Sequence, residues 1–134
     1  MRLLAEAGMQ KLNISGGEPF LQPTFIGEIF KYCKEELKIE SCSIVNNGSK
    51  VTEKWLDTYG QYLDMMAISC DSFDAETNVK LGRAEKGKWT HIQRVFQVAE
   101  WCRDRGIKVK INTVVTKSEF DIFDHISCLL IPVG

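Results

Sequence analysis

Short apolar runs alternate along this chain with longer segments of helical periodicity. The pattern predicts strands over residues 10–15, 42–46, 65–70 and 107–115, and helices over residues 23–37, after Thr52 as N-cap, and over residues 88–104. A polar loop is expected over residues 71–87, a weak helix over 119–127 and a short strand over 128–131. Because strands and helices alternate, we predict an α/β fold whose parallel strands are joined by right-handed crossovers.

The two longest predicted helices each carry one apolar stripe. The first stripe consists of Ile26, Ile29, Phe30, Cys33 and Leu37, and Pro23 suits the first turn. The second consists of Ile92, Val95, Phe96, Ala99 and Cys102, and Gly106 follows its end. We expect both stripes to pack on the sheet.

The predicted strands are apolar on one face only. Leu12 and Ile14 alternate with Asn13, and Ile111 alternates with Lys110 and Asn112. Strands covered on both faces of a parallel sheet are apolar throughout. The polar face here therefore meets either bulk water or a polar ligand inside a barrel lumen, and periodicity alone leaves both possibilities open. Four or five strands are too few for a closed barrel, which takes about 200–250 residues.

Composition narrows the class of protein. The chain has 134 residues, of which 44% are hydrophobic, and a net charge of −1, so we expect one packed domain and no nucleic-acid partner. It contains no apolar run of ~18 residues and no signal-peptide core, so we expect no membrane segment and a cytoplasmic location. The five cysteines include no C-x-x-C pair and are expected to be reduced, small buried hydrophobes.

The segment with the clearest chemistry is Ser15-Gly16-Gly17-Glu18-Pro19, directly after the first predicted strand. Two glycines let the backbone turn sharply and leave its N–H and C=O groups uncovered. Ligands of parallel α/β sheets bind at this edge, where the Glu18 carboxylate suits an ammonium group. A lone Gly-Gly turn with a surface glutamate is the plain alternative, but the four-residue string Gly-Gly-Glu-Pro after a strand is more specific.

This string resembles the GGEP motif of radical S-adenosylmethionine (SAM) enzymes, and residues 8–115, about four-fifths of the chain, resemble the viperin family among them. The matching strings are collinear. They include residues 15–22, 43–45, 47–49, 67–74, 82–83, 101–104 and 110–112. Since two separate strings, 69–74 and 110–112, lie outside the GGEP loop, a relationship to another radical SAM family through that loop alone is disfavoured.

The resemblance implies a partial (βα) barrel of the radical SAM type, open on one side, with SAM beside a [4Fe-4S] cluster in its lumen. It also implies a nucleotide dehydratase of antiviral innate immunity. The family converts CTP to 3′-deoxy-3′,4′-didehydro-CTP, and a 5′-deoxyadenosyl radical abstracts the ribose hydrogen. For the complete family protein, the implied location is the endoplasmic reticulum membrane or a lipid droplet.

Site residues follow from the resemblance by position. Gly16, Gly17, Glu18 and Pro19 would bind the methionyl amino group of SAM; Asn47, Ser69 and Arg83 would hold other parts of that cofactor or neighbouring phosphates; Lys110 and Asn112 would bind the CTP triphosphate and sugar. Taken singly, each also has a plainer explanation as a turn residue, a strand end or a solvated charge. His91 matches a family histidine, but we expect it at the surface and assign it no role.

The chain departs from the family pattern at the cluster. The family holds its cluster with C-x-x-x-C-x-x-C upstream of the GGEP loop, and no such spacing occurs here. We therefore expect residues 1–134 to be a fragment of a radical SAM core domain, truncated at both ends, and we assign no catalytic residue and no metal ligand. Two interpretations remain: half of the active site of a radical SAM lyase, or an inactive chain that at most binds SAM or CTP weakly.

Overall fold

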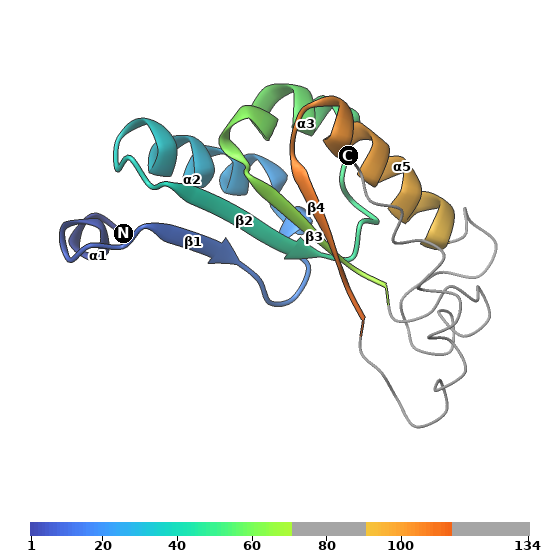
Figure 1. Cartoon of the computed structure of the whole chain (residues 1–134), viewed down its shortest axis with the longest axis horizontal. Coiled ribbons are helices and arrows are strands. Elements are labelled where there is room, and N and C mark those ends of the chain that lie inside the picture. Colours follow the sequence, from blue (N-terminus) through green and yellow to red (C-terminus); the bar gives the residue numbers. More distant parts are fainter. Residues whose placement is uncertain (71–90, 114–134) are drawn as a thin grey trace.

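The computed structural model describes residues 1–70 and 91–113, which form a four-stranded sheet and its covering helices (Figure 1). The elements in chain order are α1 (Arg2–Glu6), β1 (Lys11–Ile14), the 3-10 turn η1 (Pro19–Leu21), α2 (Pro23–Glu35), β2 (Ser41–Asn46), α3 (Glu53–Tyr59), the 3-10 turn η2 (Gly60–Tyr62), β3 (Met65–Ser69), α5 (His91–Asp104) and β4 (Lys108–Asn112). The loop predicted over 71–87 and the elements predicted over 119–131 lie outside the described residues.

All three strand pairings are parallel, and the strand order is β1-β2-β3-β4. Each strand thus pairs with the strand that follows it in the sequence, as in a (βα) barrel, where the chain progresses around the sheet in one direction. Helices α2, α3 and α5 lie along one side of this sheet (Figure 1). The predicted α/β fold of a partial barrel is confirmed.

The register assigns every strand residue to one of two faces. The covered face, which carries the helices, consists of Leu12, Ile14, Cys42, Ile44, Asn46, Met66, Ile68, Val109 and Ile111. The open face consists of Lys11, Asn13, Ser41, Ser43, Val45, Met65, Ala67, Ser69, Lys108, Lys110 and Asn112. In the two central strands, Cys42, Ile44, Met66 and Ile68 are fully buried. Val109 and Ile111 are still 36% and 39% exposed, because β4 is an edge strand of the described sheet.

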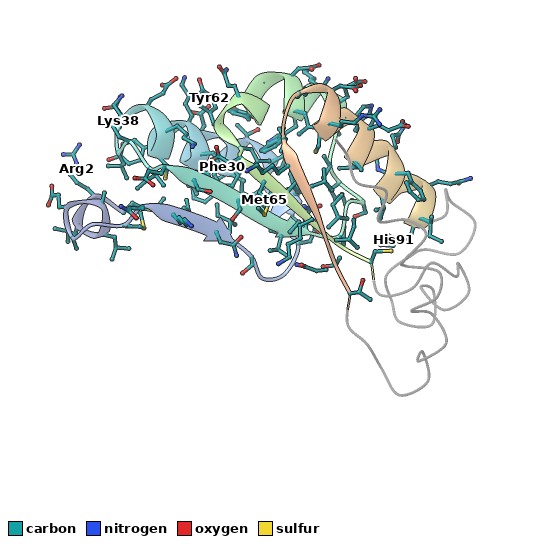
Figure 2. All side chains as sticks on the ribbon, in the orientation of Figure 1. Arg2, Phe30, Lys38, Tyr62, Met65 and His91 are labelled. Atoms are coloured by element: carbon teal, nitrogen blue, oxygen red, sulfur yellow. The ribbon has the colours of Figure 1, made fainter. Side chains whose placement is uncertain are left out.

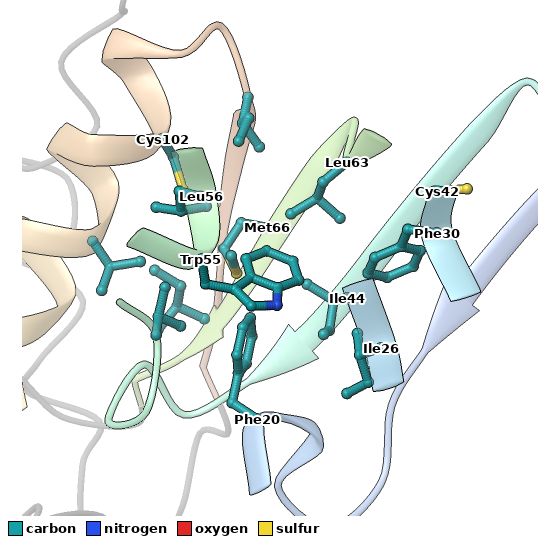
Figure 3. Close-up of a cluster of buried hydrophobic side chains, with 14 of the residues drawn as sticks. Phe20, Ile26, Phe30, Cys42, Ile44, Trp55, Leu56, Leu63, Met66 and Cys102 are labelled. Carbon is teal, nitrogen blue, oxygen red and sulfur yellow. The ribbon is translucent and has the colours of Figure 1, made fainter. Parts of the chain in front are cut away.

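The core fills the space between the covered face and the helices (Figure 3). Trp55 of α3 packs at its centre, with the ring of Phe20 edge-on at 4.8 Å between centroids. Thr52 caps α3 as predicted, its hydroxyl accepting from the Trp55 amide at 3.2 Å. The Trp55 indole N–H donates to the carbonyl of Pro23 at 2.8 Å and so joins α3 to the start of α2.

The predicted stripe of α2 is confirmed. Ile26, Phe30 and Cys33 are buried, Ile29 and Leu37 are partly buried against the core, and Pro23 is in the first turn. In α5 the prediction is wrong for Phe96, which is 46% exposed. The buried stripe there consists of His91, Val95, Val98 and Cys102. Spacings of four, three and four residues keep this set on one side of the helix, and Phe96 lies about 100° around the axis from Val95.

At the amino-terminal edge of the sheet, Asp64 joins three elements. Its carboxylate accepts from the Cys42 amide at 2.6 Å and pairs with the ammonium of Lys34 at 2.7 Å. The same ammonium donates to the carbonyl of Glu40 at 2.7 Å. The starts of β2 and β3 are thereby joined to the end of α2.

No helix among the described residues combines the length and the apolar character that a bilayer crossing requires.

Candidate functional site

The GGEP loop leaves the carboxyl end of β1 through two left-handed residues. Gly16 has φ +93° and Gly17 has φ +54°, and a Cβ at either position would meet nothing within 4 Å. The left-handed conformation, not lack of space, is therefore what requires glycine. With no side chain on two successive residues, the backbone of this loop is open to a ligand at the edge of the sheet.

The Glu18 carboxylate joins this loop to the next one. One oxygen accepts from the Phe20 amide at 3.1 Å, and the other accepts from the Asn47 amide at 3.0 Å. Pro19 and Phe20 are buried directly behind it. A carboxylate has about four acceptor positions, so Glu18 is fixed in place and still has capacity for an ammonium group.

Asn47 has a local structural role. Its side-chain oxygen accepts from both the amide and the hydroxyl of Ser49, at 2.9 and 2.6 Å, which closes a turn after β2. The preceding residue, Asn46, is 3% exposed; its amide group donates to the carbonyl of Ala67 at 3.2 Å and its oxygen accepts from the Gly48 amide at 2.7 Å. Asn46 fixes the same turn from inside the core, a role that sequence analysis missed.

The polar residues predicted on the strands share one face. Ser69 pairs with Asn112, and Ala67 pairs with Lys110 two residues earlier, so all four lie on the open face of β3 and β4. Asn13 lies on the same face of β1, where its side-chain oxygen accepts from the Ser43 hydroxyl at 2.8 Å. The structure therefore brings Asn13, Ser69, Lys110 and Asn112 onto one surface, and Arg83 lies outside the described residues.

The open face carries positive charge. Lys11, Lys108 and Lys110 are exposed on it, and none of its described strand residues is acidic. Among the described residues, Glu18 places a carboxylate at the carboxyl-terminal edge of the sheet. Such a surface suits a ligand that is anionic over the strands and bears an ammonium group near the GGEP loop.

A second residue that sequence analysis missed is Arg94 of α5. Its guanidinium donates to the carbonyl of Gly48 at 3.3 Å, to that of Val51, and to the Gln97 side chain at 2.7 Å, and it lies 5.2 Å from the centre of the Trp101 ring. The loop after β2 is thus held by Glu18 on one side and by Arg94 on the other. Nothing in the local sequence signals this, because the partners are backbone carbonyls more than 40 residues away.

The described residues do not form a site for an iron–sulfur cluster. Cys33, Cys42, Cys70 and Cys102 are free, buried and located on different elements. Burial raises the pKa of the thiols of Cys42 and Cys102 to about 11, which disfavours the thiolate form that a cluster needs. Within residues 1–70 and 91–113, no three His, Cys, Asp or Glu side chains are grouped as metal ligands.

In contrast to a cluster site, the described residues include candidates for binding SAM, namely Gly16, Gly17 and Glu18 of the GGEP loop. SAM carries a carboxylate, an ammonium and a sulfonium, and the GGEP loop offers open backbone groups next to a fixed carboxylate. The described chain therefore fits the SAM part of a radical SAM site.

Comparison with known proteins agrees with this arrangement. The sequence profile of the radical SAM superfamily matches residues 1–126, and the chain belongs to that superfamily.

Within the superfamily the chain is similar to proteins named S-adenosylmethionine-dependent nucleotide dehydratase RSAD2, which is viperin. It is 48% identical to the protein of Oncorhynchus mykiss over 123 residues, which are 90% of this chain and 35% of that protein. It is 48% identical to the protein of Danio rerio over 133 residues, 96% of this chain and 37% of that protein. A nucleotide dehydratase of a Thermoplasmatales archaeon is 37% identical over 119 residues, 88% of this chain and 41% of that protein. The chain spans little more than a third of the length of these relatives, and the predicted resemblance to the viperin family is confirmed.

Proposed function

We propose that this chain contributes the central strands of a viperin-like nucleotide dehydratase, which converts CTP to 3′-deoxy-3′,4′-didehydro-CTP in antiviral defence. The observation that carries the proposal is the alignment of Ser69, Lys110 and Asn112 on the open face of the same sheet whose first strand leads into the GGEP loop. A polar row of this kind on a parallel strand pair meets either water or a polar ligand, and the similarity to named nucleotide dehydratases favours the ligand.

In this proposal the loop and the strands bind different ligands. Gly16, Gly17, Glu18 and Pro19 hold the methionyl amino group of SAM, and Asn47, Ser69 and Arg83 orient the rest of it. Lys110 and Asn112 bind the triphosphate and the ribose of CTP, where an ammonium facing phosphate forms a charge-assisted contact. SAM supplies the radical that abstracts hydrogen, and the contribution of these residues is to bind and orient both molecules.

Titration calorimetry with CTP tests the substrate assignment on the 134-residue chain. We expect Lys110→Ala to weaken CTP binding about tenfold, which corresponds to the loss of one charge-assisted contact. Lys54→Ala is the matched control, because Lys54 is an exposed lysine of α3 on the other side of the sheet. Equal CTP affinity for the wild type and Lys110→Ala would remove Lys110 from the phosphate site.

A second candidate function is a non-catalytic chain that binds SAM or CTP weakly. The observation that favours it is the burial of all four described cysteines as separate thiols. Anaerobic reconstitution with iron and sulfide distinguishes the two candidates. Stoichiometric cluster absorbance from this chain alone would exclude the non-catalytic candidate, and its absence together with CTP binding would favour it.

A further inference from the structure

His91, the first residue of α5, is buried beside the carboxyl end of β3 (Figure 2). The residue is 4% exposed, and among the described residues only Asn46 is another buried polar residue. The expectation that it lies at the surface is therefore wrong. Its ring nitrogen Nε2 lies 2.9 Å from the carbonyl oxygen of Ser69, a residue of the open face.

The Ser69 carbonyl needs this partner because of where β2 ends. Alternate residues of a strand direct their peptide groups to opposite neighbours. Cys70 donates to the carbonyl of Asn112 in β4, so the preceding residue, Ser69, directs its carbonyl to the other side, toward β2. The last residue of β2 is Asn46, which pairs with Ile68.

The turn after β2 offers no donor in place of a strand residue. The amide that would continue the ladder belongs to Gly48, and that amide donates to the Asn46 side chain at 2.7 Å. Ser69 is partly buried, and a strand carbonyl shielded from water is costly without a donor. His91 supplies the donor. Because a carbonyl oxygen only accepts, Nε2 carries the proton.

We propose that His91 is a positioning residue for the ligand-binding end of β3: it fixes the Ser69 peptide, and thereby the direction in which the Ser69 hydroxyl and its pairing partner Asn112 face the ligands. The proposal rests on the function proposed above for the open face. Packing alone does not require a histidine here, since Val95 and Val98 continue the same stripe with apolar side chains. The ring N–H faces the Ser69 carbonyl, to which Gly48 offers no amide, and an apolar side chain at this position would leave that carbonyl without the contact.

Three variants separate positioning from packing. His91→Phe keeps an aromatic ring, slightly larger than the imidazole, and removes the donor. His91→Gln restores an N–H at a similar reach. Val95→Ala is the matched control, because it removes core packing from the next turn of α5 and touches no polar group of the strand end.

The first readout does not depend on any ligand. We expect hydrogen exchange at the Cys70 amide, which donates to Asn112 beside Ser69, to accelerate at least about tenfold in His91→Phe relative to exchange at the Asp64 amide on the opposite edge of the sheet. His91→Gln should recover most of this protection, and Val95→Ala should leave the ratio of the two amides unchanged. An unchanged ratio in His91→Phe would overturn the proposal.

The second readout is the affinity for SAM and for CTP, measured by calorimetry on the same variants below their unfolding temperatures. We expect His91→Phe to weaken binding of at least one ligand about tenfold, with recovery in His91→Gln and no change in Val95→Ala. A wild-type chain that binds neither ligand would count against the proposed function, and exchange at Cys70 would still decide whether His91 fixes the strand end. If exchange changes while both affinities stay at wild-type values, His91 is a structural residue only and the proposal fails.

Discussion

The two faces of the sheet are formed by alternate residues of the same strands, and they differ in burial and polarity. Ile44 on the covered face is fully buried among Phe30, Trp55 and the other core side chains, whereas Val45, the next residue, lies half-buried on the open face. On the covered face the side chains pack closely and exclude water. On the open face Asn13, Lys110 and their neighbours leave donors and charges available. The difference shows that packing is concentrated on one side of these strands, and the proposed ligand binding uses the other side.

The largest effect is expected when Ile44 and Val45 are each shortened to alanine. Ile44→Ala should lower the free energy of unfolding by about 3 kcal/mol, because it opens a cavity in the core. Val45→Ala, which removes two carbons where Ile44→Ala removes three, should cost less than about 1 kcal/mol. Urea denaturation measures both, and similar costs would show that the open face is packed as tightly as the covered one.

Alkaline pH should destabilise the core between the covered face and the helices through its buried thiols. Burial raises the pKa of Cys102 to about 11, whereas an unfolded thiol titrates near about 8.5. Between these values the unfolded chain loses the proton and the folded chain keeps it, so stability is complete at lower pH and falls as pH rises toward 11. The wild type should lose up to about 1.4 kcal/mol more per pH unit than Cys102→Ala.

Urea denaturation of the wild type and Cys102→Ala at several pH values above about 8.5 provides this measurement. Lysines and tyrosines contribute equally to both proteins, so the difference in slope isolates the thiol. Parallel pH profiles would show that Cys102 titrates normally in the folded chain.

Arg94 allows a further test of the comparison, because it belongs to α5 on the covered side and its guanidinium bonds to the loop after β2. Arg94→Met keeps much of the aliphatic contact and removes the bonds to Gly48 and Val51. We expect a loss of about 1–2 kcal/mol and faster hydrogen exchange at Asn47 and Ser49. Arg103→Met, an exposed arginine of the same helix, is the control and should leave that exchange unchanged.

The smallest effect is expected for the polar contact on the open face itself. Ser43→Ala removes the hydroxyl that donates to Asn13 at 2.8 Å in an exposed setting, and should cost about 0.5 kcal/mol. Asn13→Ala should cost about the same, and the double variant no more than either alone if the two costs come from this one bond. A cost above that of Arg94→Met would mean that the open face is part of the core.

The sequence was enough to predict the sheet, the two longest helices and the face that carries Asn13, Ser69 and Lys110, because alternation and helical period are local signals. It was not enough for His91. The donor at that position is explained by a carbonyl of β3 left without a partner where β2 stops, a feature that exists only after three segments assemble. The prediction that Phe96 is buried failed for a related reason, because the sequence does not show which side of α5 faces the sheet.

The same limit applies to the site residues. The Gly-Gly-Glu-Pro string predicted a sharp turn with an available carboxylate, and the structure adds that Glu18 accepts from both its own loop and the loop after β2. Asn47 was selected from that second loop, yet its buried neighbour Asn46 has the more extensive contacts, with β3 and with Gly48. Motifs identify which loops meet a ligand, and tertiary hydrogen bonds decide which of their residues are free to do so.

The contact between Phe20 and Trp55 gives the chain a built-in optical reporter. Phe20 lies two residues from Glu18, and its ring edge abuts an indole that is 5% exposed and bonded to Pro23. Emission from such an indole depends on its immediate surroundings, so a small displacement of the glycine turn should change fluorescence intensity or wavelength. Changing the other two tryptophans, Trp89 and Trp101, to phenylalanine would leave Trp55 as a single fluorophore, through which the arrival of a small molecule could be followed in solution without any label.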